Sequence, residues 1–256
     1  MALLELERVT KRFGGLVATN DISFSVHESE IAFIVGPNGA GKTTLFNLIS
    51  GVLRPDSGLI TFDGKTVQGL RPHEIAAKGI ARTFQHIRLF PKMTALENIM
   101  VGRHLHSTAG FISGMLNLPF TRREQMAVAA KSREVMEFLG IADLADAEAT
   151  SLAYGRQRVV ELGRALACEP KLLLLDEPAA GLNMRETVEI SALIGRIRDL
   201  GITIFLVEHD MSLVMNISEE ILVLSYGQKI ADDEPLAVQK NSEVIKVYLG
   251  EDSAAN

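Results

Sequence analysis

Residues 36 to 44 read GPNGAGKTT and follow the apolar run IAFIV. Gly36, Gly41, Lys42 and Thr43 match the pattern G-x-x-x-x-G-K-[ST], in which glycines let successive backbone N–H groups turn towards phosphate oxygens. The positive end of the helix that follows favours the same anion. Lys42 can reach the β- and γ-phosphates, and the Thr43 hydroxyl can ligate Mg²⁺. The stretch therefore predicts a nucleotide phosphate site that comprises Gly36, Pro37, Asn38, Gly39, Ala40, Gly41, Lys42, Thr43 and Thr44.

Three further side chains with chemical capability also follow apolar runs. Asp176 and Glu177 follow KLLLL, and His209 ends ITIFLVEH. Asp176 could complete a Mg²⁺ shell, and Glu177 could orient or deprotonate water. Taken singly, each is also explained as an ordinary charged or structural residue at a strand end. Because ligands lie beyond the carboxyl ends of parallel strands, their shared position with Gly36 predicts one site that hydrolyses a nucleotide.

The elements that would position these residues alternate between strands and helices. Four runs carry apolar residues on both faces, as is typical of central parallel strands covered on both sides: 31–35, 171–177, 202–209 and 221–227. Other patterns predict strands at 3–10, 17–26 and 59–64, and helices at 43–51 and 185–201. The alternation predicts an α/β fold.

The middle of the chain, from about residue 86 to residue 158, shows no clear strand and predicts an inserted helical lobe. Thr94 and Glu97 have the spacing of a capping box, which starts a helix. A second helix is expected over 121–140, with four apolar residues on one face: Met126, Ala129, Met136 and Leu139. We therefore divide the chain into a core (1–85 and 159–230), a lobe (86–158) and a C-terminal helix with its tail (231–256), and expect that helix to end at Gly250.

Composition narrows the class of protein. The 256 residues carry a formal net charge of −6, which argues against a nucleic-acid partner. A single cysteine, Cys168, excludes an internal disulfide and fits a reducing compartment. The start MALLELERVTKRF does not have the pattern of a signal peptide. Because no window approaches about 20 uninterrupted apolar residues, we expect any link to a membrane to pass through a partner.

In this order, the motifs resemble those of the nucleotide-binding subunit of ABC transporters over nearly the whole chain. GPNGAGKT resembles the Walker A loop, and LLLLDE resembles the Walker B strand with its following glutamate. Gln85 in TFQH matches the Q-loop glutamine, LAYGRQR at 152–158 resembles the signature motif, and AGLN at 180–183 resembles the D-loop. His209 matches the switch histidine, and Phe13 matches the aromatic residue that stacks on adenine.

The resemblance implies a P-loop NTPase (RecA-like) core with a mostly parallel sheet, an N-terminal antiparallel β subdomain and an inserted α-helical lobe. It implies ATP and Mg²⁺ as cofactors. It gives catalytic roles to Glu177, His209 and Gln85, and places Mg²⁺ with Thr43, Gln85 and Asp176.

The resemblance also implies that two subunits close head to tail around two ATP molecules. Each ATP would lie between the phosphate loop of one subunit and five residues of the other: Ala153, Tyr154, Gly155, Arg156 and Asn183. LAYGRQR precedes the run RVVELGRALA, so it is expected to present a helix N-terminus to the γ-phosphate.

The signature motif departs from the family's usual Leu-Ser-Gly-Gly-Gln. Ala153 replaces the serine, Tyr154 a glycine and Arg156 the glutamine, so a hydroxyl contact is lost while Arg156 adds positive charge. Asn183 replaces the usual D-loop aspartate. These departures concern the contacts across the two subunits and leave the residues of the contacts within one chain intact.

LAYGRQR, DEPAAGLN, VEHDMSLVM and EVIKVYLG resemble the ATPase of high-affinity branched-chain amino acid importers, which use two unlike ATPase subunits. The implied partners are membrane permease subunits, a second ATPase and, indirectly, a solute-binding protein, but no nucleic acid. The implied location is peripheral, on the cytoplasmic side of the cell membrane. Residues 101–120 resemble an extra stretch of that subunit, whose Phe111, Ile112, Met115 and Leu116 either contact a partner or pack on their own lobe.

Two other classes of protein remain to be weighed. A soluble ABC ATPase acting on nucleic acid or ribosomes often carries two cassettes or long coiled-coil insertions, whereas this chain has one cassette and no heptad run. A GTPase is expected to show an Asn-Lys-x-Asp motif, which is absent from the sequence, and a small-molecule kinase does not need the signature stretch. An importer ATPase is the leading hypothesis.

Overall fold

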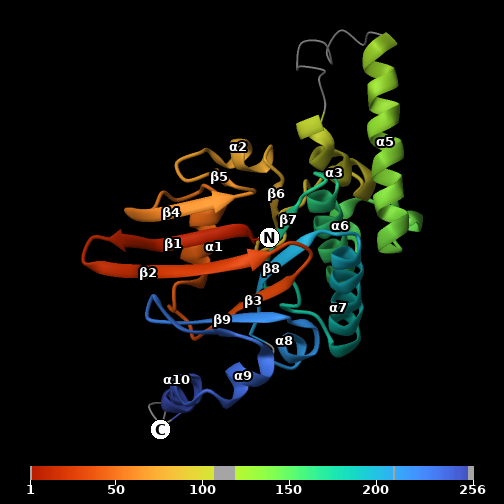
Figure 1. Cartoon of the computed structure of the whole chain (residues 1–256). Coiled ribbons are helices and arrows are strands. Elements are labelled where there is room, and N and C mark those ends of the chain that lie inside the picture. The colour runs from red at the N-terminus through yellow and green to blue at the C-terminus, as the bar shows by residue number, and fades with distance from the viewer. Residues whose placement is uncertain (1, 107–118, 210, 253–256) are drawn as a thin grey trace.

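The computed structural model describes residues 2–106, 119–209 and 211–252. Two sheets lie side by side, and a group of helices stands to one side of them (Figure 1). The stretch that holds Phe111, Ile112, Met115 and Leu116 lies outside the described residues. The predicted α/β architecture with an antiparallel β part is confirmed.

The smaller sheet is built by the N-terminal part of the chain. Its strands are β1 (Ala2–Phe13), β2 (Leu16–His27), β4 (Ser57–Phe62) and β5 (Lys65–Thr66), in the order β2-β1-β4-β5. All neighbouring strands pair antiparallel. The three strands expected at 3–10, 17–26 and 59–64 are thus confirmed.

The larger sheet has the order β10-β9-β3-β8-β7-β6. Its strands are β3 (Ile31–Val35), β6 (Ile80–Arg82), β7 (Leu172–Asp176), β8 (Thr203–Val207), β9 (Glu220–Ser225) and β10 (Gln228–Asp233). All pairs are parallel except β9 with β10. The four apolar runs form the central strands, as expected, whereas the two edge strands were not anticipated.

A hydrophobic core lies on each face of this sheet, which explains why its central strands are apolar throughout. Leu172 and Leu174 of β7 pack into the core shared with the antiparallel sheet and α1 (Lys42–Ile49). The alternate residues Leu173 and Leu175 pack on the other side, against the helices of the lobe and against α7 (Met184–Asp199) and α8 (Met211–Ile217). The sheet therefore lies between two hydrophobic layers.

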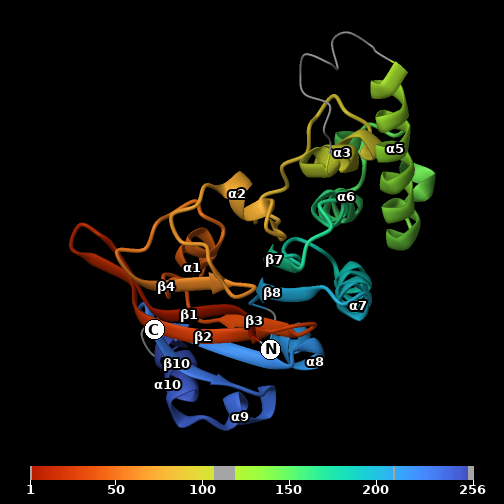
Figure 2. The same cartoon turned by 45° about the horizontal axis from the view of Figure 1, so that its top comes forward.

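The helical lobe contains α3 (Ala95–Gly102), α5 (Pro119–Leu139) and α6 (Tyr154–Leu166), with short 3-10 turns at Arg103–His106, Ala142–Leu144 and Ala149–Ser151. The turned view shows α5 on the outside of the lobe and α6 towards the sheet (Figure 2). The capping box of Thr94 and Glu97 is confirmed by both of its hydrogen bonds. Another short helix, α2 (Pro72–Ala76), precedes β6.

Of the apolar residues expected on one face of the helix over 121–140, Met136 and Leu139 are buried and Met126 is 65 % exposed. Two other expectations about helices are wrong in detail. The signature motif does not precede its helix, since α6 already begins at Tyr154. The tail is two helices, α9 (Pro235–Lys240) and α10 (Ser242–Asp252), because Asn241 takes an extended conformation between them.

The expected domain limits cut two elements. The limit at 158/159 falls inside α6, which contacts both α3 of the lobe and β6 of the sheet. The limit at 230/231 falls inside β10. Among the helices of the described residues, none combines the length and the apolar character needed to cross a membrane.

Candidate nucleotide-binding site

The phosphate loop connects the end of β3 to the start of α1 and requires glycine at two places. Gly36 has a φ of +148°, and a Cβ added to it would lie 2.1 Å from the carbonyl oxygen of Leu224. Gly41 has a φ of +104°, and its Cβ would lie 2.4 Å from the carbonyl oxygen of Ala18. Any side chain at either position would collide with backbone, so the curl of the loop depends on both glycines.

Lys42, the first residue of α1, is buried and points back into the loop. Its Nζ donates hydrogen bonds to the carbonyl oxygens of Gly36 at 2.5 Å and Pro37 at 2.9 Å. Thr43, the next residue, is exposed. The ammonium is thus placed inside the loop that the sequence predicts to hold phosphates.

Asp176, the last residue of β7, forms a buried ion pair that the sequence did not indicate. Arg82 of β6 donates from Nη2 to Oδ2 of Asp176 at 2.9 Å, and the two side chains are only 8 % and 6 % exposed. Arg82 also donates from Nη1 to Oδ1 of Asn47 at 2.7 Å and to Oγ of Ser50 at 2.9 Å. One guanidinium therefore ties β7 to the helix that follows the phosphate loop.

Glu177 is the point at which three segments of the chain meet. Nε2 of Gln85 donates to its Oε2 at 3.0 Å, and Nε2 of His209 lies 3.1 Å from its Oε1. The Glu177 backbone has a φ of +49° and donates its N–H to the carbonyl of Val207 at 3.0 Å. A left-handed conformation at a residue with a side chain costs about 1–3 kcal/mol, and such strain is often found at functional sites.

Glu208 is a site residue that sequence reasoning missed. It is buried, its Oε1 accepts from the N–H of Ala179 at 2.9 Å, and its Oε2 accepts from the N–H of His209 at 3.2 Å. It therefore links the turn after Walker B to the turn that carries His209. The only sequence signal was a carboxylate at the end of a buried apolar strand.

The expected meeting of three strand ends is confirmed. Strands β3, β8 and β7 are adjacent and parallel, so Gly36, Asp176–Glu177 and His209 all follow the same edge of the sheet. Phe13 ends β1, is 46 % exposed, and has the ammonium of Lys11 5.6 Å from its ring centroid. The individual roles of these residues stay predictions.

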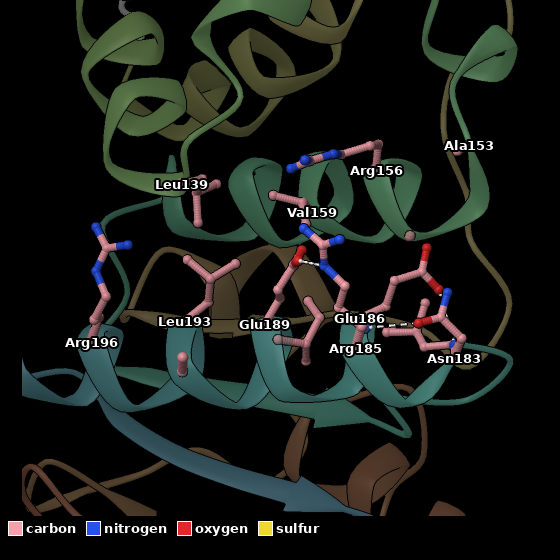
Figure 3. Close-up of a pocket in the computed structure, with 14 residues that line it drawn as sticks. Leu139, Ala153, Arg156, Val159, Asn183, Arg185, Glu186, Glu189, Leu193 and Arg196 are labelled. Atoms are coloured by element: carbon pink, nitrogen blue, oxygen red, sulfur yellow. Dashed lines mark hydrogen bonds and ion pairs between the residues drawn. The ribbon is translucent and has the colours of Figure 1, made fainter.

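The signature residues lie elsewhere, beside a groove of 510 Å³ between α6 and α7 (Figure 3). Ala153, Gly155, Arg156 and Asn183 are among the residues that line it. Of the described residues, none from 36 to 44 lines this groove. Within one chain, the signature motif and the phosphate loop therefore do not share this groove.

The signature motif and the D-loop of the same chain pack on each other. Asn183 caps α7, since its Oδ1 accepts from the N–H of Glu186 at 3.1 Å. A Cβ added to Gly155 would lie 2.6 Å from Oε1 of Glu186, and one added to Gly181 would lie 3.1 Å from the ring of Tyr154. Gly155 and Gly181 therefore lie close to the facing side chains of Glu186 and Tyr154, and the positive φ of Gly181 favours glycine there.

The residues expected to hold Mg²⁺ supply oxygen atoms, which is the donor type that this ion prefers. They are the Thr43 hydroxyl, the Asp176 carboxylate and the Gln85 amide oxygen. Arg82 donates to Oδ2 of the Asp176 carboxylate. In the described part of the chain no three His, Cys, Asp or Glu residues cluster as metal ligands. A donor set with so few carboxylates fits an ion that is held mainly by phosphates and water, as Mg²⁺ is.

The fold and the phosphate loop define a P-loop nucleoside triphosphatase. Residues 19–180 match the family model described as ABC transporter. The chain is 44 % identical over 250 residues to the high-affinity branched-chain amino acid transport ATP-binding protein BraF of Pseudomonas aeruginosa, covering 97 % of this chain and 98 % of that protein. It is 42 % identical to LivG of Escherichia coli, a protein of the same description, with the same coverage.

Solved structures agree with this assignment. The crystal structure of a nucleotide-free ATP-binding cassette from an ABC transporter matches with a TM-score of 0.85 at 32 % identity, over 97 % of this chain and 99 % of that one. The ADP conformation of an ATP-binding cassette matches with a TM-score of 0.85 at 33 % identity, over 98 % and 99 %. The chain belongs to the ABC transporter family, and it is an ATP-binding cassette ATPase.

Proposed function

We propose that this ATPase energises the import of branched-chain or related amino acids, and that Glu177 is its hydrolytic centre. The supporting observation is the convergence of Gln85 and His209 on the Glu177 carboxylate at the strand edge that also carries the phosphate loop. The solute class is supported by the descriptions of BraF and LivG, which are 44 % and 42 % identical to this chain.

In the proposed mechanism Lys42 and the loop amides hold the phosphates of ATP, and Phe13 stacks on the adenine. When bound, Mg²⁺ would supply positive charge that neutralises the charge developing on the phosphate oxygens. Glu177 orients the attacking water and accepts its proton. His209 and Gln85 hold the two oxygens of that carboxylate, so its orientation is set before water arrives.

Thr43, Asp176 and Gln85 would hold the metal ion and its water shell. Asp176 would act through Oδ1, while Arg82 keeps Oδ2. Because Arg82 donates to Oδ2 of Asp176 within a buried ion pair, it keeps the carboxylate in one orientation.

The signature surface would act on the ATP of a second subunit. Ala153, Tyr154 and Gly155 are at the N-terminus of α6, where the backbone N–H groups of the first turn are not used by the helix itself. Arg156 is exposed beside them. These donors, together with the nearby Asn183, would meet the γ-phosphate when two ATPase subunits close head to tail, and hydrolysis at Glu177 would allow reopening.

The remaining partners follow from the importer function. Permease subunits would hold the chain at the cytoplasmic side of the cell membrane, and a solute-binding protein would act through the permease. Coupling would run through the lobe around Gln85. The second ATPase would be either a copy of this chain or a similar subunit.

The test is a co-purification of the tagged Glu177→Gln variant from its native host, in mild detergent with ATP and Mg²⁺. A polytopic permease together with a second ATPase supports the importer function, and deletion of that permease should abolish uptake of radiolabelled leucine. Recovery from the soluble fraction alone, with RNA or ribosomal proteins attached, would contradict it.

A further inference from the structure

Helix α6 holds the chain segment around Gln85 with three charged side chains. Arg158 donates from Nη1 to the carbonyl of Phe84 at 3.0 Å and from Nη2 to that of Gln85 at 2.6 Å. At the far end of the segment, the N–H of Arg88 donates to Oε1 of Glu161 at 3.3 Å. Nη1 of Arg164 donates to the carbonyl of Arg88 at 2.5 Å. We call residues 84–88 the Q-loop segment. Its three holders are spaced by three residues and so share one side of α6.

Two of these three side chains, Arg158 and Glu161, form a buried charge pair with each other. Arg158 and Glu161 are 4 % and 2 % exposed, and Nη1 of Arg158 lies 3.2 Å from Oε2 of Glu161. Burial raises the pKa of the Glu161 carboxyl, and the N–H of Arg88 and the charge of Arg158 oppose that rise. The planar guanidinium presents several donors in a fixed fork, so it can bind two successive carbonyls and the carboxylate together.

The same guanidinium reaches the signature motif and, through it, the D-loop. Nη2 of Arg158 lies 3.3 Å from the hydroxyl of Tyr154, whose ring packs against Gly181. At its other end the Q-loop segment carries Gln85, whose side chain donates to Glu177. A chain of contacts therefore runs from the signature surface to the carboxylate expected to orient water.

We propose that Arg158 is a positioning residue that binds Gln85 to α6, so that a displacement of this helix moves Gln85 relative to Glu177. This inference rests on the roles proposed above for Gln85 and Glu177. Arg158 is separated in sequence from Gln85 by 73 positions, and its guanidinium binds the Q-loop segment, Glu161 and Tyr154. Loss of its hold should therefore lower kcat for ATP hydrolysis while the KM for ATP changes little.

The first test uses no nucleotide. The natural sequence contains no tryptophan, so His86→Trp introduces one fluorophore at an exposed position of the Q-loop segment. In the full chain with this reporter, Arg158→Lys should lower the fluorescence anisotropy. An ammonium keeps the charge beside Glu161 but cannot donate to both carbonyls in the geometry of a guanidinium, so the Q-loop segment should move more freely. Arg158→Gln should lower it further, and the lysine variant keeps the test valid where the glutamine variant fails to fold.

Arg103→Gln is the matched control. Arg103 also binds a main-chain carbonyl, that of Ala167 at 3.2 Å, and a carboxylate, that of Glu169 at 2.6 Å. Its anisotropy should equal that of the parent. No decrease in Arg158→Lys, or an equal decrease in Arg103→Gln, would overturn the proposal.

The second test is a double-mutant cycle on ATP hydrolysis in the complex that co-purifies with the chain. Arg158→Lys should lower kcat by about 10-fold, as expected for the loss of a charge-assisted hydrogen bond, and should have less than about 2-fold effect once Gln85→Ala is present. Equal losses in both backgrounds would overturn the proposal. If Gln85→Ala alone leaves hydrolysis unchanged, the proposed function of Gln85 fails, and the anisotropy still decides whether Arg158 holds the segment.

Discussion

The carboxyl edge of the sheet and the signature surface differ in what their side chains bind. At the edge, Glu177 is bound by Gln85 and His209, and Asp176 by Arg82. At the signature surface, Arg156 is exposed, Ala153 has no capping side chain, and the ring of Tyr154 is 45 % exposed. The edge is assembled within one chain, whereas the signature surface presents its donors outwards.

This difference follows from the elements that carry the two regions. The carboxyl ends of adjacent parallel strands lie along one edge of the sheet, so residues far apart in sequence meet there without a partner subunit. A helix N-terminus presents unused backbone N–H groups in its first turn, and these need an acceptor from outside the helix. Substitutions at the edge should therefore have large effects on turnover, ATP binding or the free energy of unfolding. Substitutions in the signature surface should change the free energy of unfolding of the single chain less.

The largest effect is expected at Glu177. Glu177→Gln should retain ATP binding but lower turnover about 10²- to 10⁴-fold, because the base that accepts the proton from water is lost. Single-turnover hydrolysis and equilibrium ATP binding measure the two quantities separately. The control is Glu134→Gln, at a surface carboxylate of α5 paired with Lys131. Near-normal turnover in Glu177→Gln would remove this residue from the role of base.

The next largest effect is on stability and concerns the buried pair behind the edge. Arg82→Met should lower the free energy of unfolding by about 3–5 kcal/mol, because the Asp176 carboxylate would stay buried without its cation. Urea denaturation without nucleotide measures this. Arg82→Met combined with Asp176→Asn should lower the free energy of unfolding by less than Arg82→Met alone. A double variant that is less stable than Arg82→Met would contradict the ion pair as the source of the effect.

Lys42 tests the phosphate loop itself. Lys42→Ala should weaken ATP binding by about 10- to 100-fold, as expected for the loss of a hydrogen bond from a charged group. Isothermal titration of the full chain with ATP and Mg²⁺ gives the dissociation constant. Lys131→Ala, which removes a lysine from an exposed pair on α5, should leave the constant unchanged. Equal affinities of Lys42→Ala and the parent would contradict the assignment of the loop.

The smallest effect is expected on the signature surface. Ala153 is the N-cap of α6 but offers no side-chain acceptor, so Ala153→Ser should stabilise the nucleotide-free chain by about 1 kcal/mol. Urea denaturation at two protein concentrations would separate this gain from dimerisation. Ala153→Gly should change stability less, because glycine caps without a side chain. A gain that appears only with ATP would show that the serine acts through the nucleotide instead.

Much of the edge could be predicted from the sequence because its signals are local. The phosphate loop depends on glycines whose φ values and close contacts only glycine tolerates. The central strands are recognisable in the sequence because they carry apolar residues on both faces. The signature helix was harder to place. Ala153 is not a residue that favours an N-cap, so the sequence carried no start signal there, and the structure shows that α6 begins at Tyr154.

By itself, the sequence determined the α/β core, the phosphate loop and the edge at which Asp176, Glu177 and His209 would meet, because strand pattern and turn chemistry depend on neighbouring residues. Only the tertiary structure decided which partners the buried arginine side chains bind. Arg82 binds Asp176 across 94 positions, and Arg158 binds Gln85 across 73. No periodicity signals such contacts, because they depend on which strands and helices the two hydrophobic cores bring side by side.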